Sequence, residues 1–185
     1  MLVAFDYAQI ELRILALLSQ DKDLLEIFKE GKDIHNAVAS EVFGVSEDAV
    51  TRDMRRQAKV INFGILYGMG VNSLHKALGG SRDDAQRFYD HYFKEFPGVA
   101  EYLIKIKHEA AKKGYTETLF GRRRYIEGIH SHIPYIRSAA ERMAVNTPIQ
   151  GSAADVIKIA MRKGNEALKD AGLLDRTHLL LQVHD

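Results

Sequence analysis

The chain has 185 residues, of which 46% are hydrophobic and 28% charged, and its formal net charge is +1. These values are typical of a soluble globular protein with one sizeable core. The absence of cysteine excludes disulfides and thiolate metal sites. No apolar run is long enough to cross a bilayer, and we expect neither a membrane partner nor a secretory signal.

The first predicted elements are a strand and three helices. Residues 2–5 form a short apolar run, which predicts a buried strand that ends at Asp6. From Ile10 the apolar residues recur at helical spacing, so a helix follows this strand. Residues 23–43 predict two short helices that are interrupted at Gly31.

The next segment, RRQAKVINFGILYG at residues 55–68, predicts an amphipathic helix with two different faces. Arg55, Lys59, Phe63 and Tyr67 are spaced by four and therefore form one slowly winding stripe. Apolar residues occupy the opposite side and should face the core. A nucleoside triphosphate, with its charged tail and planar base, would match the stripe. The alternative is a solvated basic face whose rings pack against a neighbouring element.

Two more helices and a hairpin are predicted in the middle of the chain. Residues 83–96 and 99–113 have helical patterns, and Pro97 separates them. Residues 115–126, YTETLFGRRRYI, alternate in a way that indicates a hairpin turning at Gly121.

The last third of the chain predicts two helices and a second strand. Residues 136–146 and 152–170 have helical patterns on either side of Pro148, which should interrupt them. The final segment, LLLQVHD at 179–185, predicts a buried strand that stops at Asp185.

Both ends of the chain therefore combine an apolar strand with an aspartate. Two such strands side by side would bring Asp6 and Asp185 together, and adjacent carboxylates repel unless they are protonated or bridged by cations. Carboxylate oxygens suit Mg²⁺, and a pair of ions would serve a phosphoryl transfer. The alternative is that Asp6 only caps the following helix and that Asp185 has no special role.

Six blocks together resemble the polymerase I-like (family A) DNA polymerases. DYAQIELR (6–13), RRQAKVINFGILYG (55–68) and QVHD (182–185) resemble, in order and spacing, polymerase motifs A and B and the start of motif C. EGKDIH, TLFGRRRY and AERMAVNTPIQGSAAD, at 30–35, 118–125 and 140–155, also look like this family. One departure is Ala8, where the family usually has serine.

The resemblance implies an α+β, mostly α, fold: a partial right-hand polymerase with a small antiparallel palm sheet and helical fingers. Residues 1–20 would be palm. Residues 21–114 would be mainly fingers, including the nucleotide-binding helix near 53–68. Residues 115–185 would be palm and end within motif C. The family's thumb, its proofreading domain and the continuation of motif C are not in this sequence, so we expect the isolated chain to be inactive.

The resemblance also implies roles for individual residues, together with primer–template DNA and dNTPs as partners and two Mg²⁺ ions as cofactors. The expected catalytic residues are Asp6, Asp185 and Lys59. The expected dNTP-binding residues are Gln9, Glu11, His35, Arg55, Lys59, Phe63 and Tyr67. The expected metal ligands are Asp6, Tyr7 through its carbonyl, and Asp185. The expected DNA-binding residues are Arg142, Asn146, Gln150 and His184.

The expected activity is DNA-directed DNA synthesis in replication or repair, in which a primer 3′-hydroxyl attacks the α-phosphate of a dNTP. The parent enzyme is expected to be monomeric and to act in the cytoplasm of a bacterial or phage-infected cell. A phage-type single-subunit RNA polymerase is one alternative; Glu11 argues against it, because in the DNA-polymerising family a glutamate at this place fills the space that a ribose 2′-hydroxyl would need. A DNA-binding fragment without catalytic activity is the other.

Overall fold

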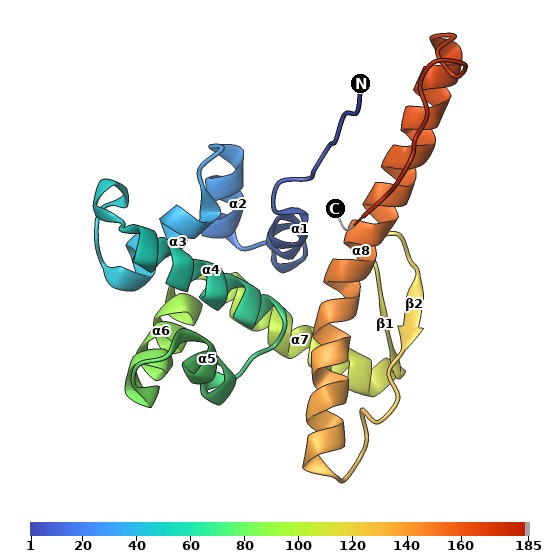
Figure 1. Cartoon of the computed structure of the whole chain (residues 1–185). Coiled ribbons are helices and arrows are strands. Elements are labelled where there is room, and N and C mark those ends of the chain that lie inside the picture. The colour runs from blue at the N-terminus through green and yellow to red at the C-terminus, as the bar shows by residue number, and fades with distance from the viewer. Residues whose placement is uncertain (184–185) are drawn as a thin grey trace.

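The computed structural model of the chain describes residues 1–183. One long helix, α8, stands upright at one side of the molecule, and a group of shorter helices lies at the other side (Figure 1). Helix α7 runs from this group to α8, and the strands β1 and β2 lie beside α8. The elements are α1 (Ile10–Ser19), α2 (Lys22–Lys29), α3 (Ile34–Phe43), the 3₁₀ turn η1 (Glu47–Ala49), α4 (Arg52–Leu66), α5 (Val71–Leu78), α6 (Arg82–Glu95), α7 (Pro97–Lys113), β1 (Tyr115–Glu117), β2 (Arg123–Tyr125) and α8 (Pro134–Asp170).

The predicted fold class is confirmed, because the described chain is mostly helical with one small antiparallel sheet. In that sheet Tyr115 pairs with Tyr125, and Glu117 pairs with Arg123. The turn contains Gly121 at φ 79°, a left-handed conformation that favours glycine. The predicted hairpin is therefore confirmed.

The main core lies between the shorter helices and one side of α8, and α4 contributes a buried face to it. Ala58, Ile61 and Ile65 on α4 are almost fully buried, as the amphipathic pattern predicts. A second, smaller apolar cluster links α7 to α8 below the hairpin: Ala110, Ile126, Ile129, Ala140 and Ala144. The two clusters hold α4 and α8 in fixed positions on the same scaffold.

Helices α2 and α7 are joined by one buried carboxylate. Asp21, with 2% of its surface exposed, accepts hydrogen bonds from the backbone N–H groups of Leu24 at 3.0 Å and Gly98 at 2.8 Å. It therefore caps α2 and accepts a hydrogen bond from a backbone N–H group in the first turn of α7. A Cβ atom on Gly98 would lie 2.9 Å from the Asp21 Cα atom, so only glycine fits this junction.

The prediction of two helices around Pro148 is wrong, because α8 is continuous from Pro134 to Asp170. Proline removes the helical hydrogen bond to the Ala144 carbonyl, but tertiary packing offsets that loss. Pro148 and Ile149 are buried, and the Thr147 hydroxyl donates to the Met143 carbonyl at 2.7 Å. Burial of this segment outweighs the weak helical propensity of its sequence.

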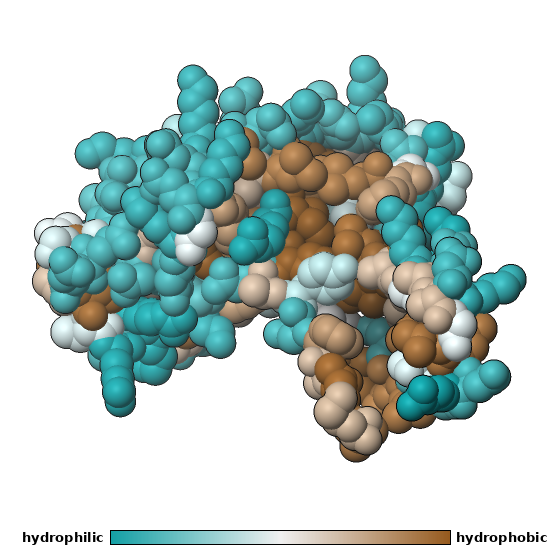
Figure 2. Space-filling view, turned by 90° about the horizontal axis from the view of Figure 1, so that it is seen from above, coloured by the Kyte–Doolittle hydropathy of each residue, from teal (hydrophilic) through white to brown (hydrophobic). Residues whose placement is uncertain are grey.

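The two predicted terminal strands are also wrong within residues 1–183. Residues 2–5 and 179–183 have no regular secondary structure, and their apolar side chains are exposed. A strand needs a hydrogen-bonding neighbour, and the described residues contain only the β1–β2 sheet. Figure 2 shows that apolar side chains gather near the middle of one face of the molecule, between polar margins.

Among residues 1–183, no helix combines the length and the apolar character that crossing a bilayer requires.

Candidate functional site

The predicted stripe of cations and rings follows one side of α4. Arg55 and Lys59 are exposed near the start of the helix, whereas Phe63 and Tyr67 are partly buried near its end. The rings of Phe63 and Tyr67 stack with their centroids 6.1 Å apart and an angle of 25° between their planes. The stripe therefore changes along its length from a charged, hydrated end to a flat aromatic end.

Arg55 is held by a carboxylate at the beginning of α3. Its Nε and Nη2 atoms both donate to one oxygen of Asp33, at 3.0 Å and 2.6 Å. Asp33 also caps α3 by accepting from the backbone N–H groups of His35 and Asn36. Burial alone would raise the pKa of Asp33, but the bonds from Arg55 and the two N–H groups together lower it. Asp33 is thus a fixed anion that orients the Arg55 guanidinium.

Lys59 is the second cation of the stripe. It has no ion pair or side-chain hydrogen bond with any other residue of the described chain. An ammonium group without a protein partner is available to an anionic ligand.

His35 lies on α3 next to the stripe. Only 3% of its surface is exposed, and the Asn62 amide nitrogen lies 3.1 Å from its Nδ1 atom. Its ring packs against Phe63, with centroids 5.9 Å apart. Burial lowers the pKa of His35; the nearby cations Arg55 and Lys59 also lower it, while Asp33 opposes them.

The end of α4 meets α1 and α8. The Tyr67 hydroxyl donates to a Glu11 carboxylate oxygen at 2.9 Å, which joins α4 to α1. Gly68, at φ 70°, lies so close to α8 that an added Cβ atom would be 3.2 Å from Arg142 Cγ. Three elements distant in sequence therefore converge at one point.

The segment before α1 is an irregular loop stabilised by one arginine. Gln9 has the left-handed φ of 57° and precedes the first helical residue. The Arg13 Nε atom donates to the Ala8 carbonyl at 3.0 Å, and the guanidinium lies 4.7 Å from the centre of the Phe28 ring. These contacts fix the turn that follows Asp6 and Tyr7, both of which are exposed.

The three predicted DNA-binding residues within α8 occupy successive turns of that helix. Arg142 and Gln150 are exposed, and Asn146 between them is partly buried. The Asn146 Oδ1 atom is buried without a hydrogen-bond partner in the described part of the chain. The fourth predicted residue, His184, lies outside the described residues.

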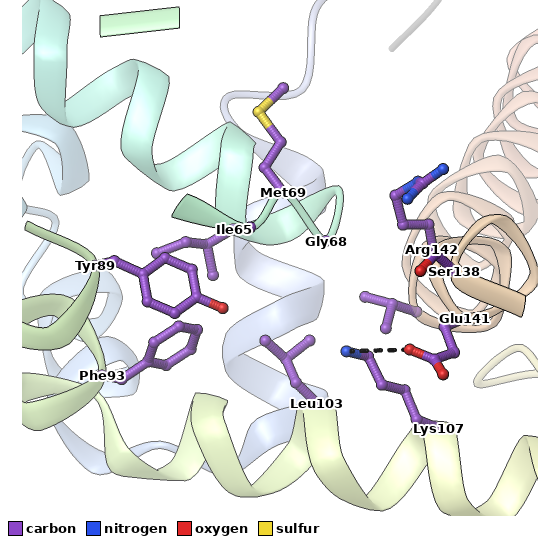
Figure 3. Close-up of a pocket in the computed structure, with 12 residues that line it drawn as sticks. Ile65, Gly68, Met69, Tyr89, Phe93, Leu103, Lys107, Ser138, Glu141 and Arg142 are labelled. Carbon is purple, nitrogen blue, oxygen red and sulfur yellow. Dashed lines mark ion pairs between the residues drawn. The ribbon is translucent and has the colours of Figure 1, made fainter. Parts of the chain in front are cut away.

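A cavity of about 250 Å³ opens where the end of α4 faces α7 and α8 (Figure 3). Tyr89 and Phe93 form one side of it. On the opposite side Lys107 pairs with Glu141 at 4.0 Å. Sequence analysis singled out none of these four residues, because the cavity exists only once α6, α7 and α8 are packed together.

Two further residues were missed although they lie within the motif blocks. Asp33, in EGKDIH, orients Arg55, and Asn62, in RRQAKVINFGILYG, contacts His35. Asn62 is the only polar side chain between Val60 and Phe63, and it is completely buried. A polar residue on the apolar side of an amphipathic helix is the sequence feature that could have identified Asn62 as a site residue.

Residues 1–183 contain no group of three or more His, Cys, Asp or Glu side chains arranged to hold a metal ion. Asp6 is exposed, and within the described chain its carboxylate has no hydrogen-bond or ion-pair partner. The Asp6 carboxylate and the Tyr7 carbonyl are hard oxygen donors of the kind that Mg²⁺ prefers. Asp185, the other predicted carboxylate ligand, lies outside the described residues, so its distance from Asp6 stays untested.

The sequence matches a known family over its whole length. The profile described as DNA polymerase family A matches residues 1–185. DNA polymerase I of Bacillus caldotenax is 52% identical over 185 residues, covering 100% of this chain and 21% of that protein. The thermostable DNA polymerase I of Thermus aquaticus is 49% identical over 185 residues, with 100% and 22% covered. The chain thus spans about a fifth of the length of these relatives.

A solved structure agrees with this match. The chain is similar to the POL domain of Pol1 from M. smegmatis, solved in complex with DNA primer-template and dNTP. The TM-score is 0.93 and the sequence identity 48%, and the comparison covers 97% of this chain and 31% of the other.

Proposed function

The chain belongs to DNA polymerase family A, and from this premise we propose that it carries the nucleotide-binding site and part of the catalytic site of a DNA-directed DNA polymerase. In the proposed reaction the 3′-hydroxyl of a DNA primer attacks the α-phosphate of a dNTP, and pyrophosphate leaves. We further propose that the intact protein is a monomer that replicates or repairs DNA in the cytoplasm of a bacterial cell.

One observation supports this proposal most strongly: α4 brings cations and rings toward the point where α1 and α8 meet. The Tyr67–Glu11 hydrogen bond and the contact between Gly68 and Arg142 define that point. A nucleotide bound along α4 would therefore have its phosphates beside Arg55 and Lys59 and its sugar and base near Phe63.

Arg55 and Lys59 would bind the triphosphate in different ways. Arg55 has a forked guanidinium that suits phosphate oxygens, and its exposed pair with Asp33 costs little to exchange. Lys59 has no competing partner in the described chain, so it is free to neutralise the leaving pyrophosphate and to protonate it. His35, beside both cations, would add a further phosphate contact.

The aromatic end of the stripe would position the sugar and base. Phe63 would lie against them, and Tyr67 would stack near the templating base. Glu11, which accepts a hydrogen bond from Tyr67, would occupy the space of a ribose 2′-hydroxyl. Gln9 is fixed in a left-handed turn one residue before α1 and would contact the same nucleotide from the other side.

The residues Asp6 and Asp185, with the Tyr7 carbonyl, would hold two Mg²⁺ ions. When bound, such a pair of ions stabilises the negative charge on the attacking and leaving oxygens of a phosphoryl transfer. The chain's own contribution is the turn after Asp6, which the bond from Arg13 to the Ala8 carbonyl holds in place. A fixed turn orders the backbone that directly follows Asp6 and Tyr7.

The exposed side of α8 would follow the primer–template duplex. Arg142, Asn146 and Gln150 are spaced by four and form one row along the helix. Together with His184 they would reach the minor groove near the primer end. That groove presents similar acceptors in every sequence, which suits an enzyme that copies any template.

The test uses two neighbouring arginines in the intact protein. Arg55 and Arg56 are both exposed, and each donates two hydrogen bonds to one aspartate oxygen: Arg55 to Asp33 and Arg56 to Asp53. Only Arg55 belongs to the stripe. In steady-state primer extension we expect Arg55→Ala to raise KM for dNTP by about tenfold or more, because charge-assisted phosphate contacts are lost.

The matched control, Arg56→Ala, should leave KM for dNTP within about twofold of the wild-type value, since it removes the same charge about 100° around the helix from Arg55. Equal effects of the two substitutions would contradict binding of the nucleotide along this stripe. Absence of templated extension by the intact wild-type protein would contradict the proposed function itself.

A further inference from the structure

A buried side-chain pair joins α3 and α4 beside the stripe. Asn62 is completely buried, His35 is 3% exposed, and the Asn62 Nδ2 atom lies 3.1 Å from His35 Nδ1. The two residues are 27 positions apart in the sequence. The contact therefore depends on how α3 packs against α4, and it is the one hydrogen bond of the His35 ring within the described chain.

The chemistry of the pair defines the state of the imidazole. With the Asn62 amide oriented as in the structure, Nδ2 donates, so Nδ1 accepts and carries no hydrogen. A neutral imidazole has one N–H group, which must then be on Nε2. His35 consequently presents a hydrogen-bond donor at the ring nitrogen that points away from Asn62.

The contact with His35 is the one side-chain hydrogen bond that Asn62 makes within the described chain. Its Oδ1 atom is buried without a hydrogen-bond partner among residues 1–183, and burial of such an atom costs free energy. A leucine would avoid that cost, but it would leave His35 Nδ1 without its hydrogen-bond partner. A buried polar residue with one orphan atom and its one hydrogen bond to a site residue points to a role in the neighbouring site.

The charges around His35 agree with a neutral ring. Asp33 faces it from the beginning of α3, and Arg55 and Lys59 face it from α4. Burial lowers the pKa of His35 first of all, and the two cations add to this effect against the single carboxylate. The ring is therefore neutral near pH 7, where only one of its two nitrogens can donate.

We propose that Asn62 is a positioning residue that holds His35 as the neutral tautomer with its hydrogen on Nε2, so that His35 donates a hydrogen bond to a phosphate oxygen of the bound nucleotide. This proposal rests on the proposed function, because it takes the triphosphate to lie beside His35. Asn62 itself does not touch the nucleotide. It acts by removing the alternative tautomer, which would present a lone pair to an anionic phosphate and repel it.

The first experiment observes the tautomer directly in the intact protein. With ¹⁵N-labelled histidine, and with His35→Gln to assign the signals, we expect the Nδ1 resonance of His35 at the position of an unprotonated acceptor at pH 7. Nε2 should appear as protonated. In Asn62→Leu the two tautomers should both be populated. A wild-type ring protonated at Nδ1, or a ring unchanged by Asn62→Leu, would overturn the proposal.

The second experiment measures KM for dNTP in primer extension as a double-mutant cycle. Asn62→Leu should raise KM roughly threefold to tenfold, the value of one phosphate hydrogen bond, with little change in kcat. In the His35→Gln background the same substitution should have no further effect, because its route to the nucleotide is gone. Equal effects in both backgrounds would show that Asn62 acts through folding and would overturn the proposal.

The third experiment uses Asn62→Asp, which accepts from Nδ1 instead of donating to it. The new carboxylate should raise the pKa of His35 in this variant. Above that pKa the ring is neutral, its hydrogen would be on Nδ1, and binding of dNTP should weaken. Below that pKa the imidazolium donates from both nitrogens, and binding should recover. Wild-type KM should stay constant over the same pH range. A flat profile for Asn62→Asp would count against the proposal.

Failure of this inference and failure of the proposed function have different signatures. If His35→Gln leaves KM for dNTP unchanged while Arg55→Ala raises it, the nucleotide binds along the stripe but His35 does not contact it. If neither substitution affects KM, the stripe is not the nucleotide site and both proposals fail.

Discussion

The Tyr67 hydroxyl donates a 2.9 Å hydrogen bond to the Glu11 carboxylate and so connects the end of α4 to the beginning of α1. Both side chains are partly buried. The bond restrains Glu11 in one position, and an acidic side chain that cannot move aside is an effective steric barrier. This relationship gives Glu11 a physical basis for its proposed role in the choice of sugar.

Replacement of Glu11 by alanine should therefore relax discrimination against ribonucleotides in the intact protein. The substitution opens the space beside the sugar and also releases Tyr67. The ratio of kcat/KM for rNTP to that for dNTP, measured on one template, reports the difference in transition-state binding. We expect this ratio to rise by about tenfold or more in Glu11→Ala.

Glu11→Gln provides the matched control, because glutamine keeps the volume and still accepts a bond from Tyr67. It should stay within about threefold of the wild-type ratio. A ratio in Glu11→Ala that does not move toward rNTP would show that another residue excludes the 2′-hydroxyl.

A second prediction concerns stability. Asp21→Ala removes the acceptor of two buried backbone N–H groups, those of Leu24 and Gly98. We expect the free energy of unfolding to fall by about 2–3 kcal/mol in denaturant titrations of the intact protein. Asp23→Ala, which removes an exposed acid from the first turn of the same helix, should lower the free energy of unfolding by no more than about 1 kcal/mol. Similar losses in the two variants would mean that the junction of α2 and α7 is not held by Asp21.

A third prediction concerns pH. The pKa of His35 is lowered by burial from its ordinary value of 6.5, so the unfolded chain binds a proton at this residue more readily than the folded one. The His35 contribution to stability is therefore fully present above pH 6.5. It falls as the pH drops from 6.5 to the folded-state pKa and changes no further below that.

His35→Gln should remove this dependence while the rest of the protein titrates as before. The measurement is the difference in unfolding free energy between wild type and His35→Gln from pH 7.5 to pH 5. We expect the advantage of the wild type to shrink as the pH falls. An advantage that stays constant would mean that folding does not shift the pKa of His35, and one that grows toward acid would mean that the folded protein holds His35 as an imidazolium.

The elements predicted correctly are those whose pattern is local. The face of α4 that contains Ala58, Ile61 and Ile65 is buried as its helical spacing indicates, and the hairpin turns at Gly121. The failures involve neighbours that are distant in sequence. Pro148 lies inside one continuous helix because tertiary packing buries it, and the run at residues 2–5 is no strand because the described chain gives it no partner.

In the candidate site, too, the features that depend on local spacing were predicted and those that depend on distant contacts were not. The stripe on α4 was visible in the sequence because four residues on one helix face keep a fixed spacing. The contacts that orient it were not, since Asp33 and His35 reach α4 from another helix. The residues around the α4–α7–α8 cavity, such as Lys107 and Glu141, come together only through the packing of three helices. The roles of Asp6, Asp185 and the remaining site residues stay predictions.

The most direct test of the account is single-turnover primer extension by the intact protein with Asp6→Asn, beside Asp23→Asn as a control for loss of an exposed aspartate. If Asp6 holds the catalytic ions, the chemical rate of Asp6→Asn should fall by roughly a thousandfold or more, while dNTP affinity changes far less. Asp23→Asn should react at the wild-type rate. A rate for Asp6→Asn within about tenfold of the wild type would contradict the assignment of this chain's catalytic centre.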